Sequence, residues 1–157
     1  MAVRGMLDVQ TLEQMVEDEQ IETILTVFPD IYGRLMGKRI TGDYFVNDVL
    51  GHGVHACDYL LACDMEMDPV PGYNFTSWAS GYGDFRLVPD LSTLRMASWL
   101  EKTAIVLCDL LHEEEEEPIS VAPRNILKKQ VEVAQSMGYT AMGASELELY
   151  LFADSYQ

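Results

Sequence analysis

The segment from Thr103 to Leu111 constrains the fold more than any other part of the sequence. Residues 104–108 read Ala-Ile-Val-Leu-Cys, an almost unbroken apolar run. An apolar run of this length is typical of a strand that is buried in a protein core. We therefore expect a sheet with this strand buried inside it.

The other segments mix helical and strand patterns. Helices are predicted over residues 8–19, about 44–51 and 123–138, and strands over residues 21–28, 31–40, 87–88 and 144–152. Pro29 and Asp30 form a short break that predicts a hairpin between the first two strands. Because strands and helices do not alternate strictly, the pattern favours an α+β fold over a doubly wound sheet.

The charge balance limits the partners of this chain. Its 157 residues, enough for about one domain, include 10 Lys and Arg against 26 Asp and Glu, a net charge of −16. Nucleic-acid binding needs clustered cations, so we expect no nucleic-acid partner. No apolar run approaches the roughly 20 residues of a membrane span. The three cysteines, without a Cys-x-x-Cys motif, fit a reduced cytosol. We expect a cytoplasmic protein without a membrane partner.

Two carboxylates stand out in the last predicted strand. Alternation along a strand places Glu146 and Glu148 on one face, about 7 Å apart. A divalent cation such as Mg²⁺ or Mn²⁺ relieves the repulsion between such groups. A half-exposed strand with a polar outer face has the same pattern without a metal. Both interpretations stay open, and a metal would need further ligands from elsewhere.

Two other segments have an ordinary interpretation beside a functional one. The acidic run Glu113–Glu117 is typical of a solvated hairpin loop, because consecutive residues cannot converge on one ion. Residues 64–85 predict a long, aromatic-rich loop, and ordered loops of this length are uncommon unless they are functional. This loop is either a lid or latch, or a packed loop with anchoring aromatic residues.

Five blocks of sequence, in this order along the chain, resemble the amino-terminal part of glutamine synthetases. The resemblance is to the glutamine-synthetase-like γ-glutamyl–amine ligases in particular, and it covers about residues 20–154. The blocks are residues 33–39 (Gly-Arg-Leu-Met-Gly-Lys-Arg), 56–61 (Ala-Cys-Asp-Tyr-Leu-Leu), 81–84 (Gly-Tyr-Gly-Asp) with Pro89-Asp90, Pro123-Arg124, and 146–152 (Glu-Leu-Glu-Leu-Tyr-Leu-Phe).

The resemblance implies a fold and an assembly. Residues 1–19 would be an N-terminal helical arm, and residues 20–118 a β-grasp domain with a latch loop at about 64–85. Residues 119–157 would begin the catalytic domain, with the Glu-x-Glu segment as its first strand. The family forms homo-oligomeric rings in which the β-grasp loop of one subunit closes over the catalytic domain of its neighbour.

The resemblance also implies an activity. The family ligates glutamate to ammonia or another amine with ATP and Mg²⁺ or Mn²⁺, through a γ-glutamyl phosphate. Glu146 would hold the metal near the ATP phosphates, and Glu148 the metal near glutamate. Asp84 would be a catalytic loop carboxylate near the ammonium subsite, where it favours a cationic amine and helps to deprotonate it.

Two departures from the family pattern modify these expectations. Residues 73–78 (Tyr-Asn-Phe-Thr-Ser-Trp) lack the acid of the Phe-Asp-Gly-Ser-Ser block of glutamine synthetases, so a bulkier amine than ammonia is plausible. The sequence also lacks the remaining metal ligands, so we expect the chain alone to be inactive. The alternatives are a non-catalytic β-grasp module that docks onto a ligase ring or another partner, and a simple divalent-cation binder.

Overall fold

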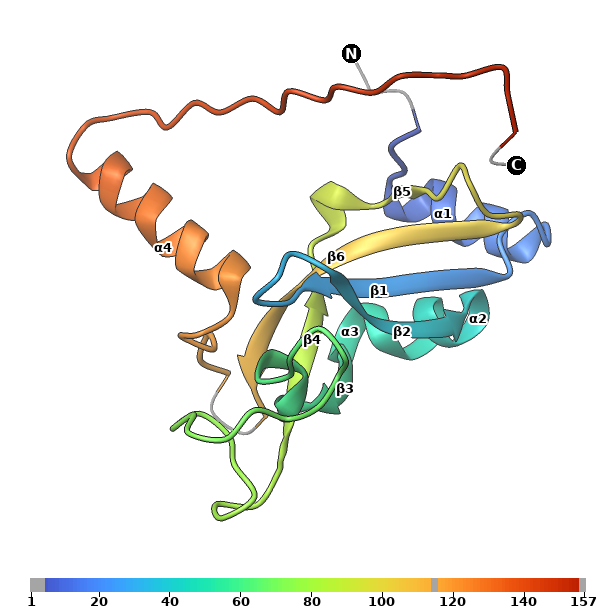
Figure 1. Ribbon diagram of the computed structural model, residues 1–157. Coiled ribbons are helices and arrows are strands. Elements are labelled where there is room, and N and C mark those ends of the chain that lie inside the picture. The colour runs from blue at the N-terminus through green and yellow to red at the C-terminus, as the bar shows by residue number, and fades with distance from the viewer. Residues whose placement is uncertain (1–4, 114–115, 156–157) are drawn as a thin grey trace.

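The computed structural model describes residues 5–113 and 116–155 (Figure 1). The elements follow one another as α1 (Val9–Glu17), β1 (Thr23–Pro29), β2 (Leu35–Thr41), α2 (Gly42–Tyr44), η1 (Phe45–Val49), α3 (Leu50–His52), β3 (Val54–Cys57), η2 (Asp58–Leu61), β4 (Asp84–Pro89), η3 (Leu91–Thr93), β5 (Arg95–Met96), β6 (Thr103–His112) and α4 (Pro123–Ser136). The predicted helices at 8–19, 44–51 and 123–138 are confirmed. The second consists of α2, η1 and α3 in direct succession, and η1 is a short π-helix.

The strands form one mixed sheet in the order β2-β1-β6-β4-β3, with β5 paired to β6 beside this path. The strand β6 runs parallel to β1 and antiparallel to β4. Its residues 103–106, 108 and 110 are buried, as the apolar run predicts. The α+β class is therefore confirmed, with β6 as the central strand.

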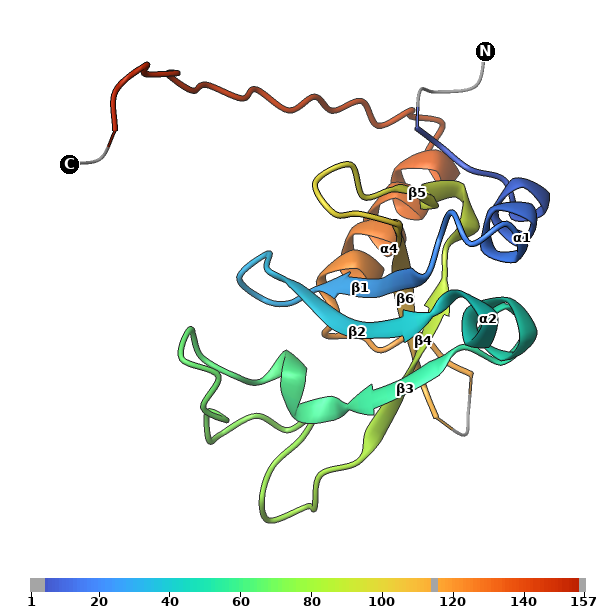
Figure 2. The ribbon, with the colours of Figure 1, turned by 90° about the vertical axis from the view of Figure 1, so that its right-hand side faces the viewer.

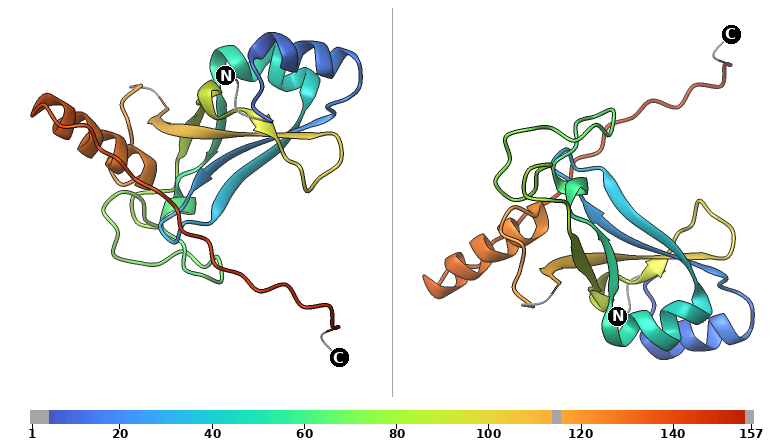
Figure 3. Two further views of the ribbon diagram at one scale, coloured as in Figure 1. Left: turned by 90° about the horizontal axis from the view of Figure 1, so that it is seen from above. Right: turned by 90° about the horizontal axis from the view of Figure 1, so that it is seen from below.

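The main core lies between this sheet and the helices α1 and α2, which stand on the same side of it, while α4 stands apart from them (Figures 2 and 3). Leu12 of α1 and Phe45 of η1 are fully buried against it. The rings of Phe28 and Phe85 meet edge to face with their centroids 5.2 Å apart, a geometry that aromatic quadrupoles favour. The burial of Leu12 makes α1 part of this core.

The predicted hairpin is confirmed, but its second strand is shorter than expected. β2 starts at Leu35, four residues later than the apolar pattern suggests. Residues 30–34 instead form a turn around Asp30, whose Oδ1 accepts the backbone N–H groups of Tyr32 at 2.9 Å and Arg34 at 2.8 Å. Aspartate favours such turns because its short side chain reaches its own backbone.

Two short strands, β3 and β5, are not predicted from the sequence. They have only four and two residues, too few for a periodic pattern. Of the acidic run, Glu114 and Glu115 lie outside the described residues. The flanking residues return antiparallel, with the N–H of Ile119 donating to the carbonyl of Leu110 at 3.0 Å, as a hairpin loop requires.

The predicted strand at 144–152 is wrong. Residues 139–152, which we call the tail segment, have no regular secondary structure and run away from α4 outside the body of the protein (Figures 1 and 2). Leu147 and Leu151 are 87% and 92% exposed. A strand exists only through hydrogen bonds to a neighbouring strand, and within the described chain the tail segment has none.

Gly37 of β2 allows β2 to approach β1 closely, and its substitution is a test of this pairing. Its φ is +151°, and a Cβ atom there would lie 1.9 Å from the carbonyl oxygen of Thr26. We expect Gly37→Ala to lower the free energy of unfolding by about 2 kcal/mol or more in urea titrations. Gly51→Ala is the control, because a Cβ at Gly51 meets nothing within 4 Å. Equal stability of both variants would contradict this account.

A buried ion pair ties the long loop to the β1–β2 turn. The Asp30 side chain is 1% exposed, and Nε of Arg34 donates to its Oδ2 at 2.6 Å. The same guanidinium donates to the carbonyls of Met65 and Asp64, both at 2.9 Å. Burial opposes the ionisation of Asp30, but the hydrogen bonds and charge of Arg34 outweigh it and hold the pKa below its usual 3.8. Arg34 therefore joins two segments thirty residues apart.

The lowered pKa of Asp30 predicts a pH-dependent stability. Its contribution is complete above pH 3.8 and is lost as the pH falls through the folded-state pKa. We expect Asp30→Asn to cost about 3 kcal/mol at neutral pH, because Arg34 loses its charged partner. The difference from the wild type should shrink below pH 3.8.

Urea titrations of both proteins across this pH range measure the difference. Asp68→Asn, at an exposed loop position, is the control and should change stability little at either pH. A cost of Asp30→Asn that stays constant down to the acid limit would show that ionisation of Asp30 does not stabilise the fold.

Candidate functional site

Asp84, the predicted loop carboxylate, opens β4 at the end of the long loop. It stands opposite Cys57 in the β3–β4 pairing and is exposed to solvent. The strand β4 therefore holds the backbone of Asp84 in place, while the side chain of Asp84 remains accessible to solvent. This arrangement suits a carboxylate that meets a ligand or partner arriving from outside.

The loop leading to Asp84 is organised around Asp58. One oxygen of Asp58 accepts the hydroxyl of Thr76 at 2.6 Å, and the other accepts the backbone N–H of Gly83 at 3.1 Å. The N–H of Asp58 in turn donates to the carbonyl of Gly83 at 2.9 Å. Sequence reasoning assigned no role to Asp58, although it lies in one of the five blocks. It fixes the loop immediately before Asp84.

The long loop is confirmed as irregular structure, since residues 62–83 contain only isolated β-bridges. Two of its aromatic rings, Trp78 and Tyr82, meet edge to face, and Tyr82 meets Tyr59 of η2 in the same way. The ring centroids of Trp78 and Tyr82 are 5.8 Å apart, and those of Tyr82 and Tyr59 are 5.7 Å apart. Trp78 is 86% exposed. The loop therefore presents aromatic side chains close to Asp84 in the sequence, in contact with Tyr59.

Glu146 and Glu148 are both exposed in the tail segment. The tail segment passes above the sheet, whereas the long loop lies at its lower end (Figures 1 and 2). The structure thus does not bring Asp84 together with the two glutamates. Among residues 5–113 and 116–155, no three His, Cys, Asp or Glu side chains form a group able to hold a metal ion. In the same part of the chain, none of the helices has the length and apolarity to span a membrane.

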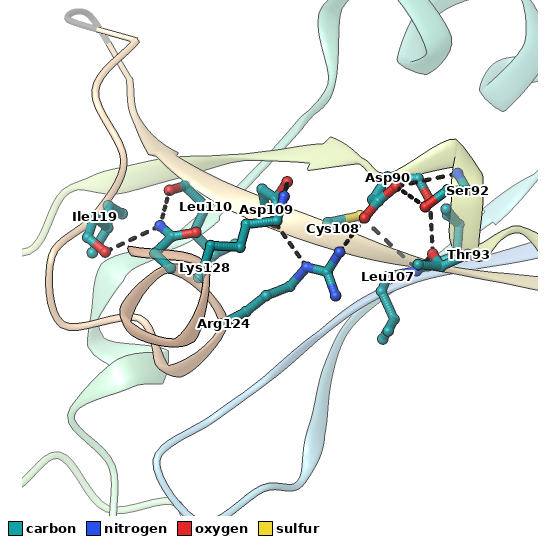
Figure 4. A network of polar contacts seen from close by, with 12 residues as sticks. Asp90, Ser92, Thr93, Leu107, Cys108, Asp109, Leu110, Ile119, Arg124 and Lys128 are labelled. Carbon is teal, nitrogen blue, oxygen red and sulfur yellow. Dashed lines mark hydrogen bonds and ion pairs between the residues drawn. The ribbon is translucent and has the colours of Figure 1, made fainter. Parts of the chain in front are cut away.

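A polar network lies where α4 meets the sheet (Figure 4). Nε of Arg124 donates to Oδ1 of Asp109 in β6 at 2.7 Å, and its Nη2 pairs with Oδ2 of Asp90, which follows β4. Nζ of Lys128 pairs with the other oxygen of Asp109. Asp90 also accepts the hydroxyl of Ser92 at 2.6 Å. We call these residues the α4 clamp.

The electrostatics of the clamp favour its ionised form. Burial opposes the ionisation of Asp90, but the hydrogen bond from Ser92 and the charge of Arg124 outweigh it and lower the pKa of Asp90. Asp90 and Arg124 come from two of the five blocks, Pro89-Asp90 and Pro123-Arg124. The order of the blocks gave no sign that they touch, because 34 residues separate them.

The comparisons with known proteins agree with the five blocks. The chain is 44% identical over 151 residues to gamma-glutamylethanolamide synthetase GlnA4 of Streptomyces coelicolor, covering 96% of this chain and 32% of that protein. It is 41% identical over 144 residues to glutamate–isopropylamine ligase of a Pseudomonas species, covering 92% and 31%. A scan against models of protein families finds no match.

The fold also matches a solved structure, described as "GmaS/ADP complex-Conformation 1", with a TM-score of 0.60 and 22% identity over 80% of this chain and 26% of that chain. Both sequence relatives are about three times as long as the present chain, which spans about a third of their length. On these similarities, the chain belongs to the glutamine synthetase family.

Proposed function

We propose that the chain is the amino-terminal β-grasp part of an ATP-dependent ligase that joins the γ-carboxyl group of glutamate to an amine. The observation that carries this proposal is the 44% identity over almost the whole chain to a protein named as a gamma-glutamylethanolamide synthetase. The second relative is named for isopropylamine. Both names refer to organic amines, in line with the acid-free residues 73–78.

Asp84 is the residue that we assign to the amine. An exposed carboxylate attracts a cationic alkylammonium group and accepts a proton from it, which frees the nitrogen lone pair for attack. The bonds of Asp58 to Thr76 and Gly83 support this role, since they hold the loop next to Asp84 in one conformation. A carboxylate on an ordered backbone loses less conformational entropy when the amine arrives than one on a mobile loop.

Glu146 and Glu148 are proposed as metal ligands, and ATP with Mg²⁺ or Mn²⁺ as co-substrate and cofactor. Carboxylate oxygens have the right chemistry for these ions, but two exposed glutamates without a third ligand do not make a site. We therefore assign no step to a metal on this chain alone. In our proposal, the site forms only when the tail segment joins the rest of a ligase subunit in a homo-oligomeric ring.

A chimera tests the proposed function. The chain replaces the matching 151 residues of the Streptomyces coelicolor relative, and ADP release is measured with glutamate, Mg²⁺ and either ethanolamine, isopropylamine or ammonium. We expect turnover with a higher kcat/KM for an organic amine than for ammonium. Asp84→Asn should lower kcat by about 100-fold, in the range of a lost general base.

Glu132→Gln is the control, because Glu132 is an exposed acid on α4 outside the assigned roles, and it should leave kcat unchanged. An assembled chimera that binds ATP but turns over none of the three amines would contradict the ligase assignment. Preference for ammonium would contradict only the assignment of the amine.

The incomplete metal site makes a separate prediction for the 157-residue chain. Calorimetric titration with Mn²⁺ should give equal heats for the wild type and for Glu148→Ala, because Glu146 and Glu148 are exposed and no group of three ligands lies in the described structure. A saturable heat that disappears in Glu148→Ala would instead support the simple cation binder.

A further inference from the structure

The helix α4 contacts the sheet only near its beginning. Beyond its first turn it is largely exposed: Leu127 is 65% exposed, Val133 46% and Met137 67%. In Figures 1 and 3 the far end of α4 projects away from the sheet. Its direction therefore depends on the few side chains near its N-terminus that bond to the sheet.

These side chains make directional bonds to the strand β6, to Asp90 and to the loop that precedes α4. Arg124 bridges β6, through Asp109, and the residue that follows β4, Asp90. The buried Nδ2 of Asn125 donates to the carbonyls of Leu110 at 2.7 Å and Ile119 at 3.0 Å. Ion pairs between planar guanidinium and carboxylate groups restrict angles as well as distances. Arg124 and Asn125 thus tie the start of α4 to the sheet and to the loop before the helix.

The positive and negative charges of the clamp are balanced. It combines two carboxylates with two cations, Arg124 and Lys128, in a sequence that has only 10 Lys and Arg against 26 Asp and Glu. The side chains of Arg124, Asp90 and Asp109 are only 21–23% exposed, so solvent screens these pairs less than pairs on an open surface.

We propose that Arg124 is a positioning residue, whose two ion pairs set the direction in which α4 leaves the sheet and the point at which the tail segment begins. The 14 residues of α4 form a helix about 21 Å long, so a tilt of about 10° moves the far end of the helix by about 4 Å. The tail segment, which carries Glu146 and Glu148, continues from the far end of α4, so the clamp sets where that segment begins.

The catalytic meaning of this inference rests on the proposed function, but its test does not, because the test measures geometry in the 157-residue chain. Nitroxide labels are attached to exposed Cys57 and to a cysteine introduced by Gln135→Cys near the end of α4; Cys63 and Cys108 are buried. Pulsed EPR then gives the distribution of distances between β3 and the end of α4. In this labelled background we expect one narrow distribution.

Removing the clamp should broaden that distribution. We expect Arg124→Met, and independently the isosteric Asp109→Asn, to broaden or shift it by about 4 Å or more, while amides of β6 remain protected from hydrogen exchange. Arg124→Lys keeps the charge but cannot bridge two carboxylates in the same way, and should give an intermediate width. Lys129→Met, which removes a cation of α4 outside the clamp, should change nothing.

Two outcomes would overturn the proposal. One is that the distance distributions of Asp109→Asn and Arg124→Met have the same width and the same centre as that of the labelled wild type. The other is equal broadening in the Lys129→Met control, which would assign the effect to the overall charge of α4. Inactivity of the chimeric ligase would contradict the proposed function and leave the EPR result unchanged.

Discussion

The pairing of β6 with its neighbours is the interaction on which the rest of the structure depends. β6 is hydrogen-bonded to β1 on one side and to β4 on the other, so it joins the N-terminal hairpin to the β3–β4 pair. Its buried side chains remove from water the apolar surface that stabilises the domain. Asp109 of the same strand anchors α4. Loss of β6 would therefore separate both halves of the sheet and release the helix.

The excess of negative charge has a more specific meaning once the fold is known. Asp58, Asp90 and Asp109 each accept hydrogen bonds from residues distant in the sequence. Asp30 holds Arg34, which in turn bonds the distant carbonyls of Asp64 and Met65. These four aspartates are structural anchors, because a partly buried carboxylate is stable only with donors around it. Asp84, Glu146 and Glu148 are exposed and remain available for ligands. Burial, and not the number of acids, separates the two groups.

The arrangement of the candidate residues explains why this chain is only part of a functional unit in our proposal. The long loop, which ends before Asp84, and the tail segment, which carries the two glutamates, lie at different ends of the structure (Figure 1). The strand β4 begins at Asp84 and is followed by Asp90, which pairs with Arg124 at the start of α4. One sheet thus carries both the proposed amine carboxylate and the helix that precedes the proposed metal ligands.

The sequence by itself determined the central strand, the hairpin, the three helical segments, the long loop and, through five ordered blocks, the family. These features depend on local periodicity and on residue identity, which a sequence displays directly. Only the tertiary structure decided that Asp90 meets Arg124 across 34 residues, that Asp58 fixes the loop, and that the tail segment is not a strand. The reason is physical: ion pairs and strand pairing need a partner in space, and the alternation of Glu146–Phe152 says nothing about whether one is present.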